Sequence, residues 1–187
     1  MKTEWEGDVV GIRPYRQSDV PLLLEAVQES MKELHEWLPW CHPEYNVHDS
    51  TEFMTTRDEE WRNGEHYSFV IHARANGFFL GGVGINFINH VHNFANVGYW
   101  VRTRATRHGV ATAAVRLAAE FAFTELKFSR LEIVAGVDNK ASQRVAEKVG
   151  AVREGLLRRR LLLDGEPQDA ILFSLIPDDL RRSGVLP

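Results

Sequence analysis

The spacing of apolar residues divides the chain into short strands and helices. A period of two, carried by β-branched and aromatic residues, predicts strands at 9–13, 67–73, 78–87, 97–101 and 130–137. Apolar residues spaced by three or four predict helices after Asp19, over 50–63, after Gly109 and, as a short helix, over 139–149. Residues 152–163 and 170–175 predict a final hairpin. This order predicts a mixed α/β sheet of about seven strands with helices on both faces.

The longest continuous signal covers residues 96–126, where a strand passes through a basic turn into a helix. A helix start leaves backbone N–H groups unpaired and carries the positive end of the helix dipole. Gly109 lets a ligand approach this backbone, and three neighbours add positive charge: Arg104, Arg107 and His108. The turn therefore favours a phosphate-bearing ligand, although a basic loop that binds only solvent has the same composition.

The distribution of charge along the chain also favours a polyanionic ligand. The chain carries 26 Asp and Glu against 22 Lys and Arg, a net charge of −4, yet no acidic residue lies between His66 and Ala119. An acidic protein is thus expected to keep one positive region around the turn, which would attract a polyanion. The overall charge and a pI near 6.1 argue against general nucleic-acid binding.

Two motifs resemble the GNAT superfamily of acetyl-CoA-dependent N-acetyltransferases. They are GYW-x(7)-HGVATAA at residues 98–114 and VDNKASQRVAEKVGA at residues 137–151. Within the superfamily, the chain most resembles the RimJ/RimL-like ribosomal-protein N-terminal (serine/alanine) acetyltransferases, over nearly its whole length. The resemblance implies a single GNAT domain over residues 1–187, with acetyl-CoA as acetyl donor and no metal.

The resemblance also implies where coenzyme A would bind. The strands at 97–101 and 130–137 would separate, and backbone of residues 99–103, with Val101 and Thr103, would pair with the pantetheine arm in the gap. Relatives usually have Gln or Arg three residues before the motif glycine, where this chain has Thr106. Most contacts would come from backbone, so the pyrophosphate is still expected at the turn and helix start: Arg107, His108, Gly109, Val110, Ala111 and Thr112.

Asn139 and Ser142 form the second part of the predicted site. The resemblance implies that Asn139 bonds the cofactor arm and that Ser142, one helical turn later, protonates the leaving thiolate. The two residues alone also fit a plain helix cap. Their combination with the turn at Gly109 favours the cofactor.

Trp37 and Trp40 belong to a Trp-Leu-Pro-Trp segment that is unusually aromatic for an exposed loop. The segment fits either a small core cluster or the wall of an acceptor groove, because aromatic side chains supply large contact areas. The resemblance favours the groove, since GNAT proteins place their first two helices over the acceptor site.

At the positions where relatives carry a candidate general base, this sequence departs from the family pattern. Relatives commonly carry Glu before the Gly-Tyr-Trp motif, where this chain has Asn96, and some carry a carboxylate at the position of Leu161. We therefore expect a water held by Asn96, or a histidine, to accept the proton of the ammonium group. The histidine candidates are His72, His90 and His92, with Glu33 and Glu36 as further candidates.

Composition and local sequence limit the remaining possibilities. A single cysteine, Cys41, fits a reducing compartment, and no apolar run resembles a signal peptide or membrane span. We expect a cytoplasmic protein, monomeric or homodimeric, that binds neither nucleic acid nor membrane. Three consecutive arginines at 158–160 are expected to be solvated on a strand, with contact to an acidic partner as the alternative.

Three functions fit these observations. The first is acetyl transfer to the N-terminal α-amine of a protein. The second is the same chemistry on a small amine such as a polyamine, antibiotic or amino acid; the RimJ/RimL-like branch contains both. The third is a non-catalytic acetyl-CoA sensor, which the absence of Glu at position 96 would favour.

Overall fold

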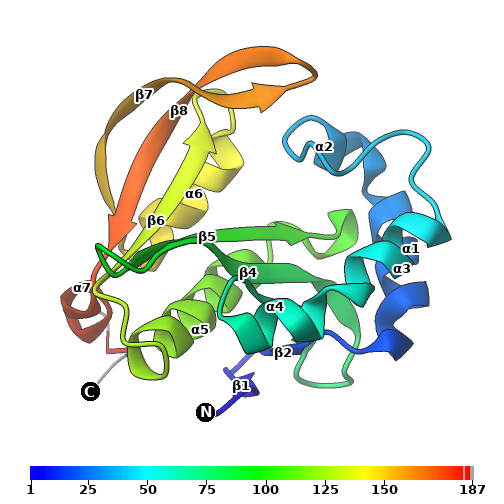
Figure 1. The fold of residues 1–187 in the computed structure, drawn as a ribbon, viewed down its shortest axis with the longest axis horizontal. Helices are drawn as coiled ribbons and strands as arrows, with labels where there is room; N and C mark the ends of the chain where they lie inside the picture. The colour runs from blue at the N-terminus through cyan, green and yellow to red at the C-terminus, as the bar shows by residue number, and fades with distance from the viewer. Residues whose placement is uncertain (183, 186–187) are drawn as a thin grey trace.

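A single eight-stranded sheet organises the protein. The computed structural model describes residues 1–182 and 184–185. The strands lie in the spatial order β1-β2-β3-β4-β5-β6-β8-β7, and only β5 and β6 are parallel neighbours (Figure 1). Their bounds are β1 Trp5–Glu6, β2 Val10–Pro14, β3 Tyr67–Ala73, β4 Phe79–Asn89, β5 Phe94–Val101, β6 Arg130–Gly136, β7 Val152–Leu163 and β8 Glu166–Leu175.

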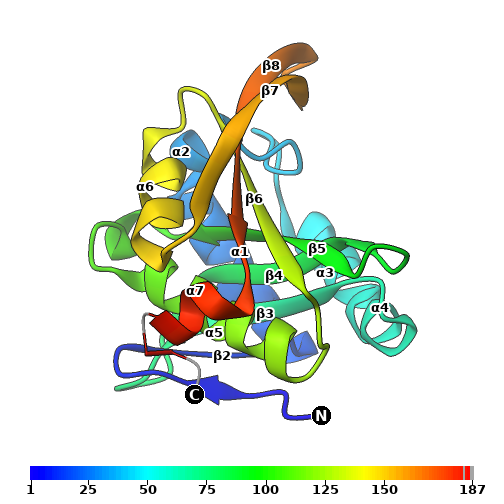
Figure 2. The same ribbon diagram turned by 90° about the vertical axis from the view of Figure 1, so that its left-hand side faces the viewer.

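Helices cover both faces of this sheet, as the sequence predicts. The helix α5 packs against β2, β4 and β5 on one face, whereas α1 packs against β4 and α3 on the other (Figure 2). The helical segments are η1 Gln17–Asp19, α1 Val20–Glu29, α2 Met31–His35, α3 Val47–Thr55, α4 Arg57–Asn63, η2 Thr103–Ala105, α5 Val110–Thr124, α6 Lys140–Val149 and α7 Pro177–Arg182.

Two hydrophobic clusters correspond to the two faces. The larger one joins the buried stripe of α5, including Phe121, to Phe69 on β3 and Leu131 on β6. The smaller one joins Leu23 and Val27 of α1 to buried residues under α3. The stripe that predicts α5 is therefore the inner face of a helix laid across the middle of the sheet.

The helix expected over residues 50–63 is two helices, α3 and α4. Asn46 caps α3 by accepting the N–H of His48, so this helix begins earlier than expected. It ends near Thr55, whose hydroxyl donates to the carbonyl of Glu52, and Arg57 donates its Nε to the carbonyl of Phe53. Side chains thus compete for carbonyls that a continuous helix would use. Further differences are the helices α2 and α7, which the sequence analysis does not predict, and the short strand β1, which raises the strand number to eight.

None of the helices within residues 1–182 is long and apolar enough to span a lipid bilayer.

Candidate active site

The separation of β5 and β6 creates the main candidate site. These parallel strands pair only at their first residues, up to Asn96 opposite Glu132, and then diverge (Figure 1). The diverging halves, residues 96–101 and 133–136, face each other across a cavity of about 400 Å³. Another side of the cavity is closed by Leu34 of α2 and by Trp37, which follows this helix. The expected gap between the central strand and its parallel neighbour is therefore present.

The backbone of β5 offers hydrogen-bonding groups to this gap. The N–H of Arg102 donates to the carbonyl of Leu80 on β4, so the alternate residues Tyr99 and Val101 direct their N–H and C=O groups toward the opposite edge. Val101 is thus available to a ligand. Thr103 is not, because its N–H donates to Ser30 Oγ at 2.9 Å and its carbonyl accepts from Thr106. This corrects the expected role of the Thr103 backbone.

The turn before α5 places an open helix start at one end of the cavity. Arg107 and Gly109 adopt positive φ angles of 64° and 80°, and α5 begins immediately afterwards at Val110. A Cβ added at Gly109 would meet no atom within 4 Å, so space remains above this backbone. Arg107 and His108 are exposed beside it, whereas Val110 is buried in the core. The free N–H groups and the open space fit a phosphate group.

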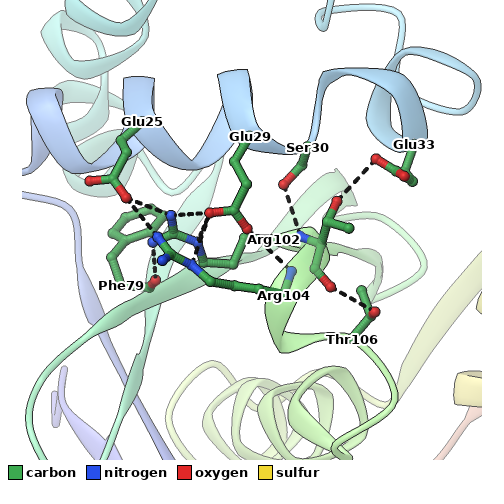
Figure 3. A network of polar contacts seen from close by, with 9 residues as sticks. Glu25, Glu29, Ser30, Glu33, Phe79, Arg102, Arg104 and Thr106 are labelled. Carbon is green, nitrogen blue, oxygen red and sulfur yellow. Dashed lines mark hydrogen bonds and ion pairs between the residues drawn. The ribbon is translucent and has the colours of Figure 1, made fainter.

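The turn is less basic than the sequence suggests, because α1 supplies the carboxylates that the acid-free span lacks (Figure 3). Arg102, 1% exposed, bonds Glu25 at 2.7 Å and also pairs with Glu29. Arg104 pairs with the same two carboxylates at 2.7 and 2.9 Å. The arginines hold the pKa of the Glu29 carboxyl below its usual range despite the opposing effect of burial. Arg104 is therefore a structural partner of α1, and among the described residues Arg107 is the arginine of the turn that pairs with no carboxylate.

The same network fixes α1 and α2 over the end of β5. Ser30, fully buried at the end of α1, accepts the N–H of Thr103, and Glu33 on α2 accepts the Thr103 hydroxyl at 3.0 Å (Figure 3). One set of hydrogen bonds thus holds α1 and α2 to the turn before α5. Sequence reasoning missed this contact, although Glu25 and Glu29 lie one helical turn apart on the exposed side of α1.

Asn139 and Ser142 lie together in the cavity wall at the start of α6. Asn139 is the N-cap, and its Oδ1 accepts the backbone N–H of Ser142 at 2.9 Å. The cap interpretation is confirmed, and it leaves the Asn139 Nδ2 amide available to a ligand. The hydroxyl of Ser142 lies 3.0 Å from the hydroxyl of Tyr99, which reaches across the gap from β5.

Tyr99 contributes its side chain to the candidate site, whereas the sequence predicted a role only for its backbone. Its hydroxyl also donates to the backbone carbonyl of Ser142 at 3.0 Å. Burial raises the pKa of Tyr99 to about 12, so its phenol stays protonated at neutral pH. The position of Tyr99 in the Gly-Tyr-Trp motif could have indicated this role, because the alternation of side chains along β5 directs Tyr99 toward the gap.

The two predicted tryptophans occupy different positions. Trp37 lines the cavity and lies over β6 so closely that a Cβ on Gly136 would be 3.0 Å from its ring. Trp40 is outside the cavity wall and 42% exposed, where it packs edge-on against Trp100 with ring centroids 5.9 Å apart. Trp40 therefore does not line this cavity but supports Trp100, which does, and its contact with an acceptor stays a prediction.

The candidates for a general base are reduced by the structure. Asn96 lines the cavity and donates its Nδ2 to Asn86 at 2.8 Å, so its Oδ1 is available to hold a water. The three proposed histidines lie elsewhere among the described residues: His72 faces Glu6 at 3.6 Å, and His90 and His92 lie at the turn between β4 and β5. Among the cavity-lining residues, Glu33 is the single carboxylate, while Glu36 does not line it.

Comparison with known proteins identifies the family. Residues 10–152 match the family model of the acetyltransferase (GNAT) domain, and because this is more than half of the chain, the protein belongs to that family. It is an N-acetyltransferase of the GNAT type, as the motifs predict, and the mixed α/β fold of that family is confirmed.

Three relatives illustrate the range of similarity. "Putative ribosomal N-acetyltransferase YdaF" of Bacillus subtilis (strain 168) is 28% identical over 171 residues, which are 89% of this chain and 91% of the relative. The structure of Mycobacterium smegmatis RimJ in complex with CoA-disulfide has 28% identity and a TM-score of 0.83, covering 94% of this chain and 89% of RimJ. Spermidine N(1)-acetyltransferase of Escherichia coli (strain K12) is 30% identical over 84 residues, 45% of each chain.

Proposed function

We propose that this protein transfers an acetyl group from acetyl-CoA to the N-terminal α-amine of a protein. The observation that most supports this proposal is the cavity between the diverging β5 and β6. The open helix start of α5 lies at one end of this cavity, and α2 lies on another side. Such a cavity offers separate approaches for a phosphate-bearing donor and for an acceptor. The printed name of YdaF, a putative ribosomal N-acetyltransferase, supports a protein acceptor.

The cofactor would lie along β5. Backbone groups of Val101 would pair with pantetheine amides as an added strand would. The N–H groups at the α5 start, residues 109–112, would hold the pyrophosphate, with Arg107 and His108 screening its charge. Asn139 would donate its Nδ2 to the cofactor arm from the opposite wall. The RimJ structure in complex with CoA-disulfide supports this location through the similarity of the two folds.

The acetyl transfer would proceed by direct attack of a neutral amine on the thioester carbonyl. Holding both reactants in one cavity supplies orientation, and a β5 N–H facing the gap polarises the carbonyl oxygen. Ser142 would donate a proton to the departing sulfur, and Tyr99 would orient that hydroxyl. A water on Asn96, or the carboxylate of Glu33, would accept the proton from the ammonium group.

A small amine is the second candidate acceptor. The similarity to spermidine N(1)-acetyltransferase and the carboxylate of Glu33 in the cavity wall favour it, because a carboxylate also attracts a polyamine. The sensor alternative has no support from these relatives. For the whole chain we propose one cytoplasmic GNAT domain, monomeric or homodimeric.

Thiol release from acetyl-CoA distinguishes the acceptors. The purified protein would be assayed with short peptides that begin with Ser or Ala, and with a panel containing spermidine, amino acids and aminoglycosides. Peptide turnover with a kcat/KM at least tenfold above that of every amine supports the proposed function. Turnover restricted to the amines contradicts it and supports the second candidate.

A further inference from the structure

An unusual bulge interrupts β7 near the cavity. Leu157 is opposite Ala170 and Leu161 is opposite Gln168, so the three residues 158–160 face the single residue Asp169. Arg159 takes a positive φ of 51°, and its N–H donates to Asp169 Oδ1 at 2.7 Å. A bulge of this kind redirects side chains out of the regular strand pattern, and bulges are common beside functional sites.

The bulge presents three exposed guanidinium groups without carboxylate partners. Among the described residues, no ion pair or side-chain hydrogen bond involves the guanidinium of Arg158, Arg159 or Arg160. By contrast, Arg130 on β6 holds Glu154, near the base of the hairpin, through two bonds of 2.7 and 2.6 Å. The nearest acid, Asp169, already accepts a backbone N–H. The bulge is therefore a concentrated positive surface on a protein of net charge −4.

This positive surface borders the proposed acceptor side. Leu161, the residue after the bulge, lines the cavity. The hairpin tip reaches toward α2, where Asp164 lies 3.9 Å from His35 (Figure 1). Glu33 of α2 and Trp37, just after this helix, also line the cavity. A polypeptide whose first residue lies in the cavity and whose next residues leave past the hairpin would meet the arginines at the bulge.

We infer that residues Arg158–Arg160 bind acidic side chains of the acceptor polypeptide, a few residues after its acetylated N-terminus. This inference rests on the proposed function, because it requires a polypeptide acceptor. Leu161, directly after the bulge, lines the cavity, and an extended chain covers roughly 3.3–3.6 Å per residue, so we expect the favoured Asp or Glu within about the first six positions. Exposed ion pairs are individually weak, so two acidic residues are expected to raise kcat/KM by about tenfold.

A polyanionic RNA is the competing ligand for exposed arginines. The acidic net charge of the protein and the limited size of the bulge favour a peptide carboxylate over a phosphate backbone, which needs an extended basic surface. The two ligands are separated by measuring both peptide selectivity and RNA binding in the same variants.

The experiment compares two peptides that differ only at positions 3–6, one with two Glu and one with two Gln. The test variant is Arg158→Gln/Arg160→Gln, which leaves the backbone of Arg159 unchanged. Arg153→Gln, an exposed arginine on the same strand outside the bulge, is the control. The expected ratio of kcat/KM, acidic over neutral, is about ten for the unaltered protein and Arg153→Gln, and below three for the double variant.

The outcomes separate the two claims. Turnover of the neutral peptide at equal rates in all variants supports the proposed function independently of the bulge. A ratio near one in the unaltered protein, or a ratio that the double variant does not change, overturns the inference. Loss of RNA binding in the double variant with an unchanged peptide ratio also overturns it, in favour of the phosphate ligand. If no peptide is turned over while amines are, both claims fail.

Discussion

The hydroxyl of Tyr99 lies 3.0 Å from the hydroxyl of Ser142, joining β5 to the first turn of α6 across the gap between β5 and β6. Each group has a second constraint: Tyr99 bonds the Ser142 carbonyl, and the Ser142 N–H bonds Asn139. Two elements of the cavity wall thus hold one hydroxyl in a fixed position. If Ser142 is the proton donor to the thiolate, Tyr99 is its positioning residue.

Ser142→Ala is expected to lower kcat on the order of 10²-fold, because proton transfer to a leaving group contributes about that much. Tyr99→Phe is expected to lower kcat by about tenfold with little change in the KM for acetyl-CoA. The double variant should resemble Ser142→Ala alone, since the two groups act as one unit. Steady-state kinetics check this; multiplicative losses in the double variant would show that Tyr99 acts independently of Ser142.

Gly109→Ala tests the position of the pyrophosphate. At a φ of 80° an added Cβ strains the backbone by about 1 kcal/mol and enters the open space above the α5 start. The KM for acetyl-CoA is expected to rise at least tenfold. Gly77→Ala is the matched control, because Gly77 has a φ of 70° and equally open space but lies in the turn between β3 and β4. Equal effects of both changes on KM would contradict the assignment.

Glu33→Gln separates the two candidates for the general base. If Glu33 accepts the ammonium proton, kcat/KM should fall at least 10²-fold and the pH–rate profile should change shape. Glu36→Gln, one turn away and outside the cavity wall, should have almost no effect. A small loss with an unchanged profile would instead support a water held by Asn96, and Asn96→Ala should then show the large loss.

Arg102 is expected to be the most sensitive charged residue for stability. Arg102→Gln removes a buried guanidinium that bonds the carbonyl of Phe79 and pairs with Glu25 and Glu29, and leaves Glu29 with Arg104 alone. Because Glu29 is partly exposed and keeps Arg104, the free energy of unfolding is expected to fall by about 1–3 kcal/mol, the cost of leaving a buried hydrogen-bonding group without its partner. Breaking the exposed pair between Arg16 and Glu4 with Arg16→Gln should cost less than about 1 kcal/mol. Urea titrations of both variants give the comparison, and similar midpoints would refute it.

The lowered pKa of His66 should make the stability of the protein depend on pH. Burial, with a smaller contribution from the Arg57 charge, lowers its pKa from 6.5 to about 4. Below pH 6.5 the unfolded chain binds a proton that the folded protein does not, so stability falls as the pH drops from about 6.5 to about 4. The contribution is about 3 kcal/mol. His66→Gln should flatten this part of the curve, whereas the exposed His48→Gln should not; parallel curves for all three proteins would exclude the effect.

The parts of the fold that could be predicted from the sequence depend on residues close together along the chain. The strand expected at 67–73 has those bounds as β3, and the α5 stripe is buried as expected, because periodicity and turn residues act within a few positions. The gap between β5 and β6, which opens after Asn96, and the position of Ser142 in the cavity wall could be predicted from motifs that the family shares.

The parts that sequence reasoning missed depend on distant contacts. Arg102 and Glu25 are 77 positions apart, and no local pattern indicates that α1 would neutralise the turn. Trp40 has the composition of a binding residue, but its place behind Trp100 is set by how the loop after α2 folds back. The displacement of the three histidines from the cavity likewise follows from sheet order, which single-sequence patterns define poorly.

The most direct test of the proposed function is to locate the acetyl group on the product. A peptide with an N-terminal Ser, one internal Lys and two Glu within its first six residues would be incubated with acetyl-CoA, beside the same peptide with a blocked α-amine. Mass spectrometry should find a single acetyl group on the α-amine of the free peptide and none on the blocked one. Acetylation of the Lys side chain in both peptides, or of added spermidine alone, would contradict N-terminal acetyl transfer.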